Sequence, residues 1–464
     1  MGAKRTGIET MILLALAATW IFATTDTSTR VALPPHGEGR FAGVDTLALD
    51  WLEREALTRN PTLAAMRATA AEARAHARVA GSLEDPTVDI AWAPRSYVEP
   101  HSGDMAGHLM TGSPADVFPA YRWRVRQTLS IFGERGLERR SARADAGAAF
   151  LDAEAARLDL LEQVRLAFFD LYQVERALET NAEQVLLVSQ FRRVALARYA
   201  SGSEGQQDPL SADTELGMLA HQEAMLGRER RVARVRLNTL LNRPPALPLP
   251  PPPQRLELPA LGDTARATLA SRAPWPELRA SEARVAAGEA RMTLANRGRF
   301  PKFEIGFERD LFMDEWERRS VAMVGLNLPL ALGRQAATRD EARAALARAR
   351  AEQAAATGRV AQRVEEARAD YEEALHEIEV LESILLPTSE RALGAARAGY
   401  ESGRGTFLPL IEAARRRAEA RLAVEGARAR AARGWAMLQR AVAGDVLTLT
   451  PAGAGASDRK EPQR

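Results

Sequence analysis

The 464-residue sequence contains no cysteine, and aromatic residues make up only 6% of it. Without cysteine, the chain can form no disulfide and no thiolate metal site, and it has no N-terminal cysteine to carry a lipid. Ala, Arg, Glu and Leu dominate instead, which favours long, closely packed helices over a thick aromatic core. The sequence also lacks a nucleophile–base set, a phosphate-binding loop, a zinc motif and a cofactor fingerprint. We therefore predict neither an enzyme nor a bound cofactor.

An excess of one sign of charge is also missing. The 63 basic and 61 acidic residues nearly balance, and they are mostly interleaved along the predicted helices. This pattern is typical of solvated helix faces with ion pairs between residues one turn apart. Because no basic patch can be located, nucleic acid is not a predicted partner.

Long apolar runs are almost absent, with one exception at the N-terminus. Lys4 and Arg5 precede "MILLALAATWIFA", residues 11–23, which is typical of an export signal cleaved at or shortly after Ala23. An uncleaved membrane anchor is the alternative. No other segment approaches the roughly 18 apolar residues of a membrane-spanning helix. The chain is therefore predicted to be exported with a signal peptide over residues 1–25.

What the sequence does contain is one long unit in two copies. "RYASGSEGQQDPLSA" (198–212) recurs as "GYESGRGTFLPLIEA" (399–413), with Tyr199, Gly202 and Gly403 marking the same reversal in two helical tracts. Glycine permits the positive φ that such a reversal usually needs. Apolar residues spaced by seven before each break indicate coiled-coil packing, and about 65 residues of helix would form a rod near 100 Å long. In each copy a shorter helix precedes the rod, over about 52–79 and 264–297.

The chain is therefore predicted to have five parts: a signal peptide (1–25), a first repeat (26–243), a Pro-rich linker (244–262), a second repeat (263–443) and a flexible tail (444–464). The first repeat contains a strand hairpin (86–130), a long helix (134–198) and a return helix (207–242). The second repeat contains a strand hairpin (301–331), a long helix (334–398) and a return helix (408–443).

Strict alternation of apolar and polar residues appears between the short helix and the rod of each copy. "TVDIAWA", "YRWRVRQ", "FEIGFER" and "AMVGLNLPL" each predict a strand with one apolar and one polar face. In an exported chain such strands suit an outer-membrane barrel, but four strands cannot close one, and an open edge in lipid is very costly. We therefore predict a trimer in which three chains supply twelve strands.

The order of these features resembles the TolC-type family of outer-membrane efflux proteins. The resemblance rests on the duplicated plan, on "QTLSIFGERGLERRSARA" (127–144) and "LNLPLALGRQAATRDEARA" (326–344), and on the two turn sequences. It implies a mainly α-helical fold with a twelve-stranded barrel, continued by a coiled-coil tunnel in the periplasm. It also implies an outer-membrane homotrimer that docks to a periplasmic adaptor and an inner-membrane pump of the resistance-nodulation-division (RND) class. "GSLEDPTVDIAWAP" is most similar to the branch that exports heavy-metal cations.

The same resemblance implies a gate at the two turns. By position it assigns an acidic ring to Glu412, with Pro409 at the second acidic position, and polar links among Asp208, Tyr400 and Arg404. The structural alternatives are that Glu412 is a first-turn residue at a helix N-terminus and that Asp208 caps the helix before Pro209.

Two further groups of residues have open interpretations. Arg122, Arg124 and Arg126, with Glu304 and Glu308, either line a charged barrel lumen or form cross-strand ion pairs. The segment 96–120 gathers residues whose side chains suit copper or silver, although a long loop can also hold them by chance. These residues are His101, Met105, His108 and Met110.

The function predicted from the sequence is a passive exit duct for an efflux machine, with heavy-metal cations as cargo. The alternatives are the same duct serving a multidrug RND pump or type I protein secretion, and a periplasmic coiled-coil scaffold without a pore. The scaffold does not account for the strands or for the export signal.

Overall fold

The computed structural model describes residues 46–92, 121–259, 275–311 and 318–443. The predicted signal peptide, the loop with His101, Met105, His108 and Met110, and the predicted tail lie outside these residues. Among the described residues, no helix combines the length and the apolar character needed to cross a membrane. The protein is mainly helical, as predicted.

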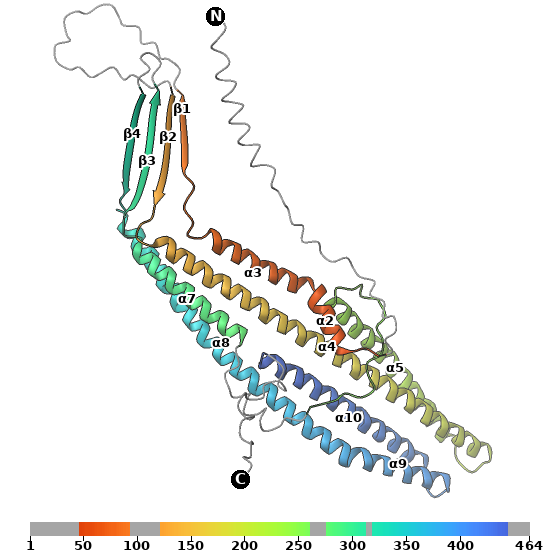
Figure 1. The fold of residues 1–464 in the computed structure, drawn as a ribbon. Helices are drawn as coiled ribbons and strands as arrows, with labels where there is room; N and C mark the ends of the chain where they lie inside the picture. The colour runs from red at the N-terminus through yellow and green to blue at the C-terminus, as the bar shows by residue number, and fades with distance from the viewer. Residues whose placement is uncertain (1–45, 93–120, 260–274, 312–317, 444–464) are drawn as a thin grey trace, which may run out of the picture. The chain divides into compact units, whose positions relative to one another are not determined.

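The same order of elements occurs twice along the chain (Figure 1). Each half has one helix or two, then two strands, then a long helix and a return helix. The first half comprises α2 (Leu49–Arg59), α3 (Pro61–Val79), β1 (Thr87–Trp92), β2 (Tyr121–Leu129), α4 (Glu134–Ala200) and α5 (Gln207–Leu240). The second half comprises α7 (Pro276–Arg297), β3 (Lys302–Leu311), β4 (Arg318–Asn327), α8 (Leu332–Val380), the π-helical turn η1 (Leu381–Leu385), α9 (Leu386–Glu401) and α10 (Phe407–Ala441).

The short helix predicted over 52–79 is two helices that meet at Asn60. The Asn60 side chain accepts a hydrogen bond from the backbone N–H of Leu63 at 3.1 Å, and Pro61 is the first residue of α3. A residue before proline is driven out of the α region, and asparagine is a favourable N-cap. The single-helix prediction was wrong because Asn60–Pro61 ends one helix and starts the next.

The long helix of the second half also departs from the prediction, since a π turn interrupts it. Leu381–Leu385 has π-helical hydrogen bonding, and the N–H of Leu386 donates to the carbonyl of Leu381, five residues earlier. Pro387 follows directly, and its missing N–H and its ring disturb the normal bonding of the preceding turn. In the first half, α4 runs for 67 residues without such a break.

The four strands form one antiparallel sheet in the order β1-β2-β3-β4. In this register Val88 pairs with Val125, Val125 with Phe307, and Ile305 with Val324, so one face of the sheet is apolar. These five side chains are between 40% and 78% exposed, because no other described element covers them. Within the described part of the chain, β1 and β4 are the edge strands and have no further strand paired to them.

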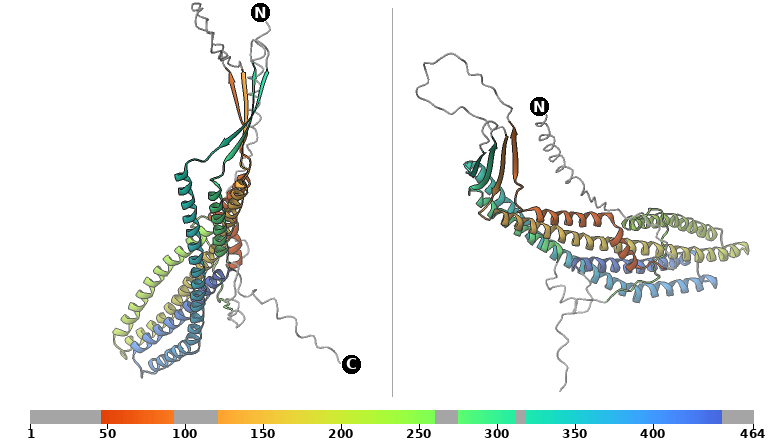
Figure 2. Two further views of the ribbon diagram at one scale, coloured as in Figure 1. Left: turned by 90° about the vertical axis from the view of Figure 1, so that its left-hand side faces the viewer. Right: turned by 45° about the horizontal axis from the view of Figure 1, so that its top comes forward.

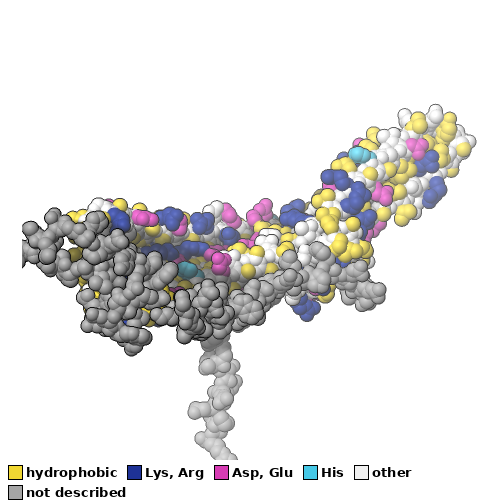
Figure 3. Space-filling model, turned by 90° about the horizontal axis from the view of Figure 1, so that it is seen from above, with side chains coloured by type: hydrophobic (Ala, Val, Ile, Leu, Met, Phe, Trp, Pro, Cys, Tyr) yellow, Lys and Arg dark blue, Asp and Glu magenta, His cyan; other side chains and the backbone are white. Residues whose placement is uncertain are grey.

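Helices follow the strands in the same lateral order, with α3 packed on α4, α4 on α7, and α7 on α8. Figure 2 shows these elements from two further sides, and Figure 3 shows charges of both signs interspersed along one face. Small residues allow close packing: a Cβ on Gly434 of α10 would lie 3.2 Å from the Cα of Tyr371 on α8. Tyr371 is fully buried beside Trp435, with ring centroids 5.3 Å apart.

Candidate functional site

The two helix reversals have the same backbone geometry. Gly202 and Gly403 have φ of 74° and 75°, and each N–H donates to the carbonyl of the tyrosine three residues earlier at 3.0 Å. Only glycine adopts this left-handed conformation without strain. The repeated Tyr-x-Ser-Gly pattern therefore encodes one turn twice.

The two tyrosines of these turns have different environments, although they occupy equivalent positions. Tyr400 is 1% exposed and packs edge-on against Phe407, whereas Tyr199 is 45% exposed. The hydroxyl of Tyr400 donates a hydrogen bond to Oδ2 of Asp208, at 3.4 Å, across 192 residues of sequence. This contact joins α9 of the second half to α5 of the first. It is the link between Asp208 and Tyr400 that was expected from the sequence.

Asp208 does not cap its helix, so that alternative was wrong. Helix α5 begins at Gln207, which places Asp208 in its first turn, and the residue before the helix makes no side-chain capping bond. Asp208 is only 8% exposed. Burial and the nearby Glu204 raise the pKa of the Asp208 carboxyl, although Tyr400 and Arg198 oppose the shift. Burial, together with the charge of Asp208, raises the pKa of Tyr400 to about 12.

Arg198 completes this cluster and was missed in the sequence. Its guanidinium lies 4.4 Å from the centroid of the Tyr400 ring and donates to the backbone carbonyl of Glu401 at 3.0 Å. It also lies 3.6 Å from the carboxylate of Glu204. An arginine over an aromatic ring is an attractive arrangement. The sequence signal was the asymmetry of the two copies, since the first tyrosine follows an arginine and the second follows Gly399.

Arg404 does not reach Asp208, which corrects the other expected link. Its Nε donates to the Ser402 hydroxyl at 3.3 Å, within its own turn. The adjacent Gly405 lies against the backbone of the preceding helix, where a Cβ would be 3.1 Å from the carbonyl carbon of Gly399. A Cβ at position 405 would therefore fit only if that backbone moved by a few tenths of an ångström.

Glu412 is the sixth residue of α10 and so lies in the second helical turn of that helix. The interpretation of Glu412 as a residue of the first helical turn was therefore wrong. Its side chain is 48% exposed and lies 3.7 Å from Arg416, one turn further along the helix. Pro409 is exposed near the start of the same helix. The first turn of α10, which starts at Phe407, contains no acidic residue.

Beyond the two helix reversals, ion pairs between helices also connect the two halves of the chain. The Glu215 side chain is 5% exposed, and its carboxylate accepts from Arg415 at 2.5 Å, which joins α5 to α10. Arg421 of α10 pairs with Glu183 of α4. Because the Glu215 carboxylate is buried, the Arg415–Glu215 pair is screened less than the exposed Arg421–Glu183 pair. These pairs were not predicted, because each joins positions far apart in the sequence.

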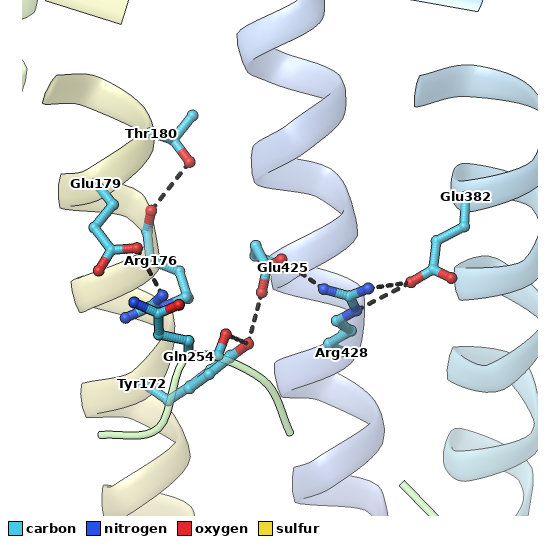
Figure 4. Close-up of polar contacts among 8 residues, drawn as sticks. All are labelled: Tyr172, Arg176, Glu179, Thr180, Gln254, Glu382, Glu425 and Arg428. Atoms are coloured by element: carbon cyan, nitrogen blue, oxygen red, sulfur yellow. Dashed lines mark hydrogen bonds and ion pairs between the residues drawn. The ribbon is translucent and has the colours of Figure 1, made fainter. Parts of the chain in front are cut away.

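A chain of polar contacts connects three helices at the level of the π turn (Figure 4). The Tyr172 hydroxyl on α4 donates to Glu425 on α10 at 2.7 Å. Arg428, one turn further along α10, pairs with Glu425 at 2.7 Å and with Glu382 of η1 at 2.6 Å. Arg428 is thus held between the return helix and the π turn. Burial, with the hydrogen bond to Glu425, raises the pKa of Tyr172.

The charged side chains of the strands pair across the polar face of the sheet. Arg122 and Arg124 both contact the carboxylate of Glu308, at 3.1 and 2.6 Å. Arg126 pairs with Asp89 at 2.7 Å and lies 3.6 Å from Glu304. The structure therefore contains the cross-strand ion pairs of one interpretation. Asp89 takes part in these pairs and was not predicted to. Among the described residues, no group of three or more His, Cys, Asp or Glu side chains could hold a metal ion.

Comparison with known proteins gives this arrangement a context. Residues 270–444 match the family described as "Outer membrane efflux protein". The outer-membrane channel OprN has a similar structure, with a TM-score of 0.69 and 21% identity over 86% of this chain and 90% of that one. The chain has the fold of an outer-membrane efflux channel.

Other solved structures show the same likeness. The outer membrane protein VceC of Vibrio cholerae has a TM-score of 0.72 and 17% identity, over 86% of this chain and 96% of its own. CusC has a TM-score of 0.70 and 18% identity, over 85% and 92%. No curated protein sequence matches the chain significantly. In this channel fold the four strands and the two turns lie at opposite ends of the long helix α4.

Proposed function

We propose that the protein is a homotrimeric channel of the outer membrane, and that it acts as the passive exit duct of a tripartite efflux system. The observation that carries this proposal is the sheet. Its apolar face is exposed, its polar face holds paired charges, and neither of its edges has a partner strand among the described residues. A sheet of this kind is stable in lipid only when other strands close it.

Three copies would supply twelve strands, which is within the range of closed outer-membrane barrels. In this barrel, Val88, Val125 and Phe307 would face lipid, and Arg122, Arg124 and Arg126 would face the lumen with their carboxylate partners. The helices would extend into the periplasm, where the turns would meet a periplasmic adaptor and an inner-membrane RND transporter.

We further propose that the turns form the gate. The Tyr400–Asp208 hydrogen bond and the Arg198–Tyr400 contact hold the helical hairpin α9–α10 against α4–α5. Opening the mouth would separate these hairpins, so the cluster would favour the closed state. Glu412, exposed beside the second turn, would place one carboxylate per chain near the mouth and would favour the passage of cations.

Heavy-metal cations are the proposed cargo. The support is the sequence around Asp85–Pro86 at the entry to β1, together with the proposed ring of Glu412 carboxylates. Deleting the gene from its host tests this point. The highest concentration of copper, silver, zinc or cobalt salts at which the host still grows should fall. A lower limit for drugs alone, with unchanged metal limits, would assign the duct to a drug pump.

The trimer itself is tested by the mass of the detergent-purified full chain, measured by light scattering with the detergent contribution subtracted. Three copies per particle would support barrel closure by neighbouring chains. A monodisperse single copy in mild detergent, with the strands protected from protease, would overturn the proposed channel and favour a scaffold.

A further inference from the structure

A basic groove runs between α3 and α4. It has a volume of about 550 Å³, and its walls include Arg74 and Arg78 of α3 and Arg139 and Arg143 of α4. All four arginines are exposed. The floor is apolar and is formed by Ala77, Ala146, Gly147 and Phe150. An apolar floor between basic walls suits an amphiphilic anion better than a free ion.

The charge of this groove is not neutralised by the part of the chain that the structure describes. Arg139 donates to the backbone carbonyl of Gly81 at 3.3 Å, and Arg74 lies 4.7 Å from the centroid of the Phe150 ring. Neither contact involves a carboxylate. No ion pair is found for Arg78 or Arg143 within the described residues.

The opposite side of the same stretch of α4 is different. There α4 packs on α7, and Asp145 and Asp152 of α4 pair with Arg291 and Arg284 of α7. Arginines against this part of α4 are therefore matched by carboxylates on one side and left unmatched on the other. Four unmatched arginines around one hollow repel each other unless an anion lies between them.

Exposed apolar side chains lead directly from the strands to this groove. Val79 and Leu83, which follow Arg78 in the chain, are 68% and 56% exposed. Val88 and Ile90, on the apolar face of β1, are 55% and 56% exposed. If the proposed function holds, this apolar surface contacts acyl chains. The arginines then begin where lipid phosphates lie.

We propose that this groove binds the headgroup phosphate of an anionic phospholipid in the periplasmic leaflet of the outer membrane. Arg78 and Arg143 supply the free guanidinium groups, which hold phosphate oxygens in a bidentate way. Arg74 and Arg139 add positive charge, and the apolar floor receives the glycerol and the first methylenes. This inference rests on the proposed membrane insertion of the sheet.

Native mass spectrometry of the detergent-purified full chain tests the site. The protein is titrated with phosphatidylglycerol, with phosphatidylcholine of the same acyl chains, and with inorganic phosphate. The test variant is Arg78→Gln with Arg143→Gln. The matched control is Arg228→Gln with Arg231→Gln, two exposed arginines on α5 that lose the same charge outside the groove.

We expect the native chain and the control to retain phosphatidylglycerol with equal affinity. The groove variant should bind it about 25-fold more weakly, since each of its two replaced arginines contributes about a factor of five near a lipid surface. Phosphatidylcholine should bind weakly to all three proteins, and inorganic phosphate should not displace phosphatidylglycerol.

Three results would overturn the inference. Equal phosphatidylglycerol binding by the groove variant and the native chain would exclude the groove as the site. Displacement by inorganic phosphate would identify a free-anion site. Loss of the oligomer in the groove variant alone, with unchanged lipid binding per chain, would show that a second copy covers the groove. The copy number of the native protein is read from the same spectra, so a failure of the proposed trimer is seen separately.

Discussion

The hydroxyl of Tyr400 lies 3.4 Å from the carboxylate of Asp208, so the second helix reversal is hydrogen-bonded to the first turn of the helix that follows the other reversal. Tyr400 is buried between Phe407 and the guanidinium of Arg198. The equivalent Tyr199 is 45% exposed and has no such bond among the described residues. Of the two equivalent tyrosines, Tyr400 thus forms a contact between the hairpins α9–α10 and α4–α5, and Tyr199 remains exposed.

Replacing Tyr400 with phenylalanine should loosen the proposed gate. The variant keeps the ring and removes the hydroxyl, which leaves the buried carboxylate of Asp208 without this donor. A hydrogen bond to a charged group contributes about 1.5–3 kcal/mol. We expect Tyr400→Phe to raise the open probability in planar bilayers several-fold, while Tyr199→Phe should leave it unchanged. Equal effects of the two substitutions would show that the hydroxyl of Tyr400 has no gating role.

The proposed gate should close more firmly as the pH falls. The folded-state pKa of Asp208 is raised, chiefly by burial. A raised carboxyl pKa contributes stability that is present below the unfolded pKa, near 4, and is lost as the pH rises through the folded value. Opening the mouth would return Asp208 to water and so lower its pKa toward the ordinary aspartate value. Protonation of Asp208 would then favour the closed state, so acidification to just above the ordinary aspartate range should lower the open probability.

Asp208→Asn should give this low open probability already at neutral pH, because the amide oxygen still accepts from Tyr400. Asp213→Asn, which changes an exposed carboxylate on the same helix, should keep the native pH response. A native-like pH response in Asp208→Asn would assign the effect to another group.

Arg428 should stabilise the π turn. Its guanidinium joins Glu382 of η1 to Glu425 of α10. Arg428→Gln leaves both carboxylates without their cation, at a cost of about 1–2 kcal/mol after allowance for the partial exposure of Glu382. We expect a lower unfolding temperature and faster amide hydrogen exchange over residues 381–385. Arg368→Gln removes an exposed pair with Glu365 and should change neither value. Unchanged exchange at η1 in Arg428→Gln would contradict this role.

Gly434 should be required for the close packing of α10 on α8. A Cβ there would lie 3.2 Å from the backbone of Tyr371, so Gly434→Ala should destabilise the protein by about 1–3 kcal/mol. A Cβ added to Gly358 of α8 would have no heavy atom within 4 Å. Gly358→Ala should therefore stabilise the protein by up to about 1 kcal/mol. Thermal unfolding in detergent measures both. A Gly434→Ala protein as stable as the native chain would show that the helices can separate without cost.

Glu412 is the residue on which the proposed cation preference depends. Its side chain is half-exposed and forms an ion pair at 3.7 Å with Arg416, one turn further along α10. Glu412→Gln should lower the ratio of cation to anion permeability measured from reversal potentials in a salt gradient. Glu419→Gln, two turns further along the same helix, should preserve it. A ratio that depends on Glu419 instead would move the filter along α10.

The local parts of this fold could be predicted because they follow from chemistry that lies close together in the sequence. Gly202 and Gly403 mark turns that need a positive φ, and alternation over "FEIGFER" marks a strand with two different faces. The break at Asn60 could also have been found, because Asn–Pro is a strong local signal. The π turn before Pro387 was harder, since a proline inside a long helix allows several local solutions.

The contacts between the halves could not be derived from local pattern. Asp208 was recognised by its position in the turn, but its burial against Tyr400 depends on how two hairpins pack. Arg198 reaches Tyr400 across 202 positions, and Glu215 reaches Arg415 across 200. Such pairs follow from the register of helices that pack side by side, which a single sequence does not specify.

The most direct test of the central claim is single-channel recording in planar bilayers, with the native chain and with Tyr400→Phe, from preparations shown to contain three copies. The account predicts discrete conductance steps, which should be rare or small for the native chain and larger or more frequent for the variant. A trimeric preparation that inserts into the bilayer and gives no steps with either chain would contradict the assignment as an exit duct.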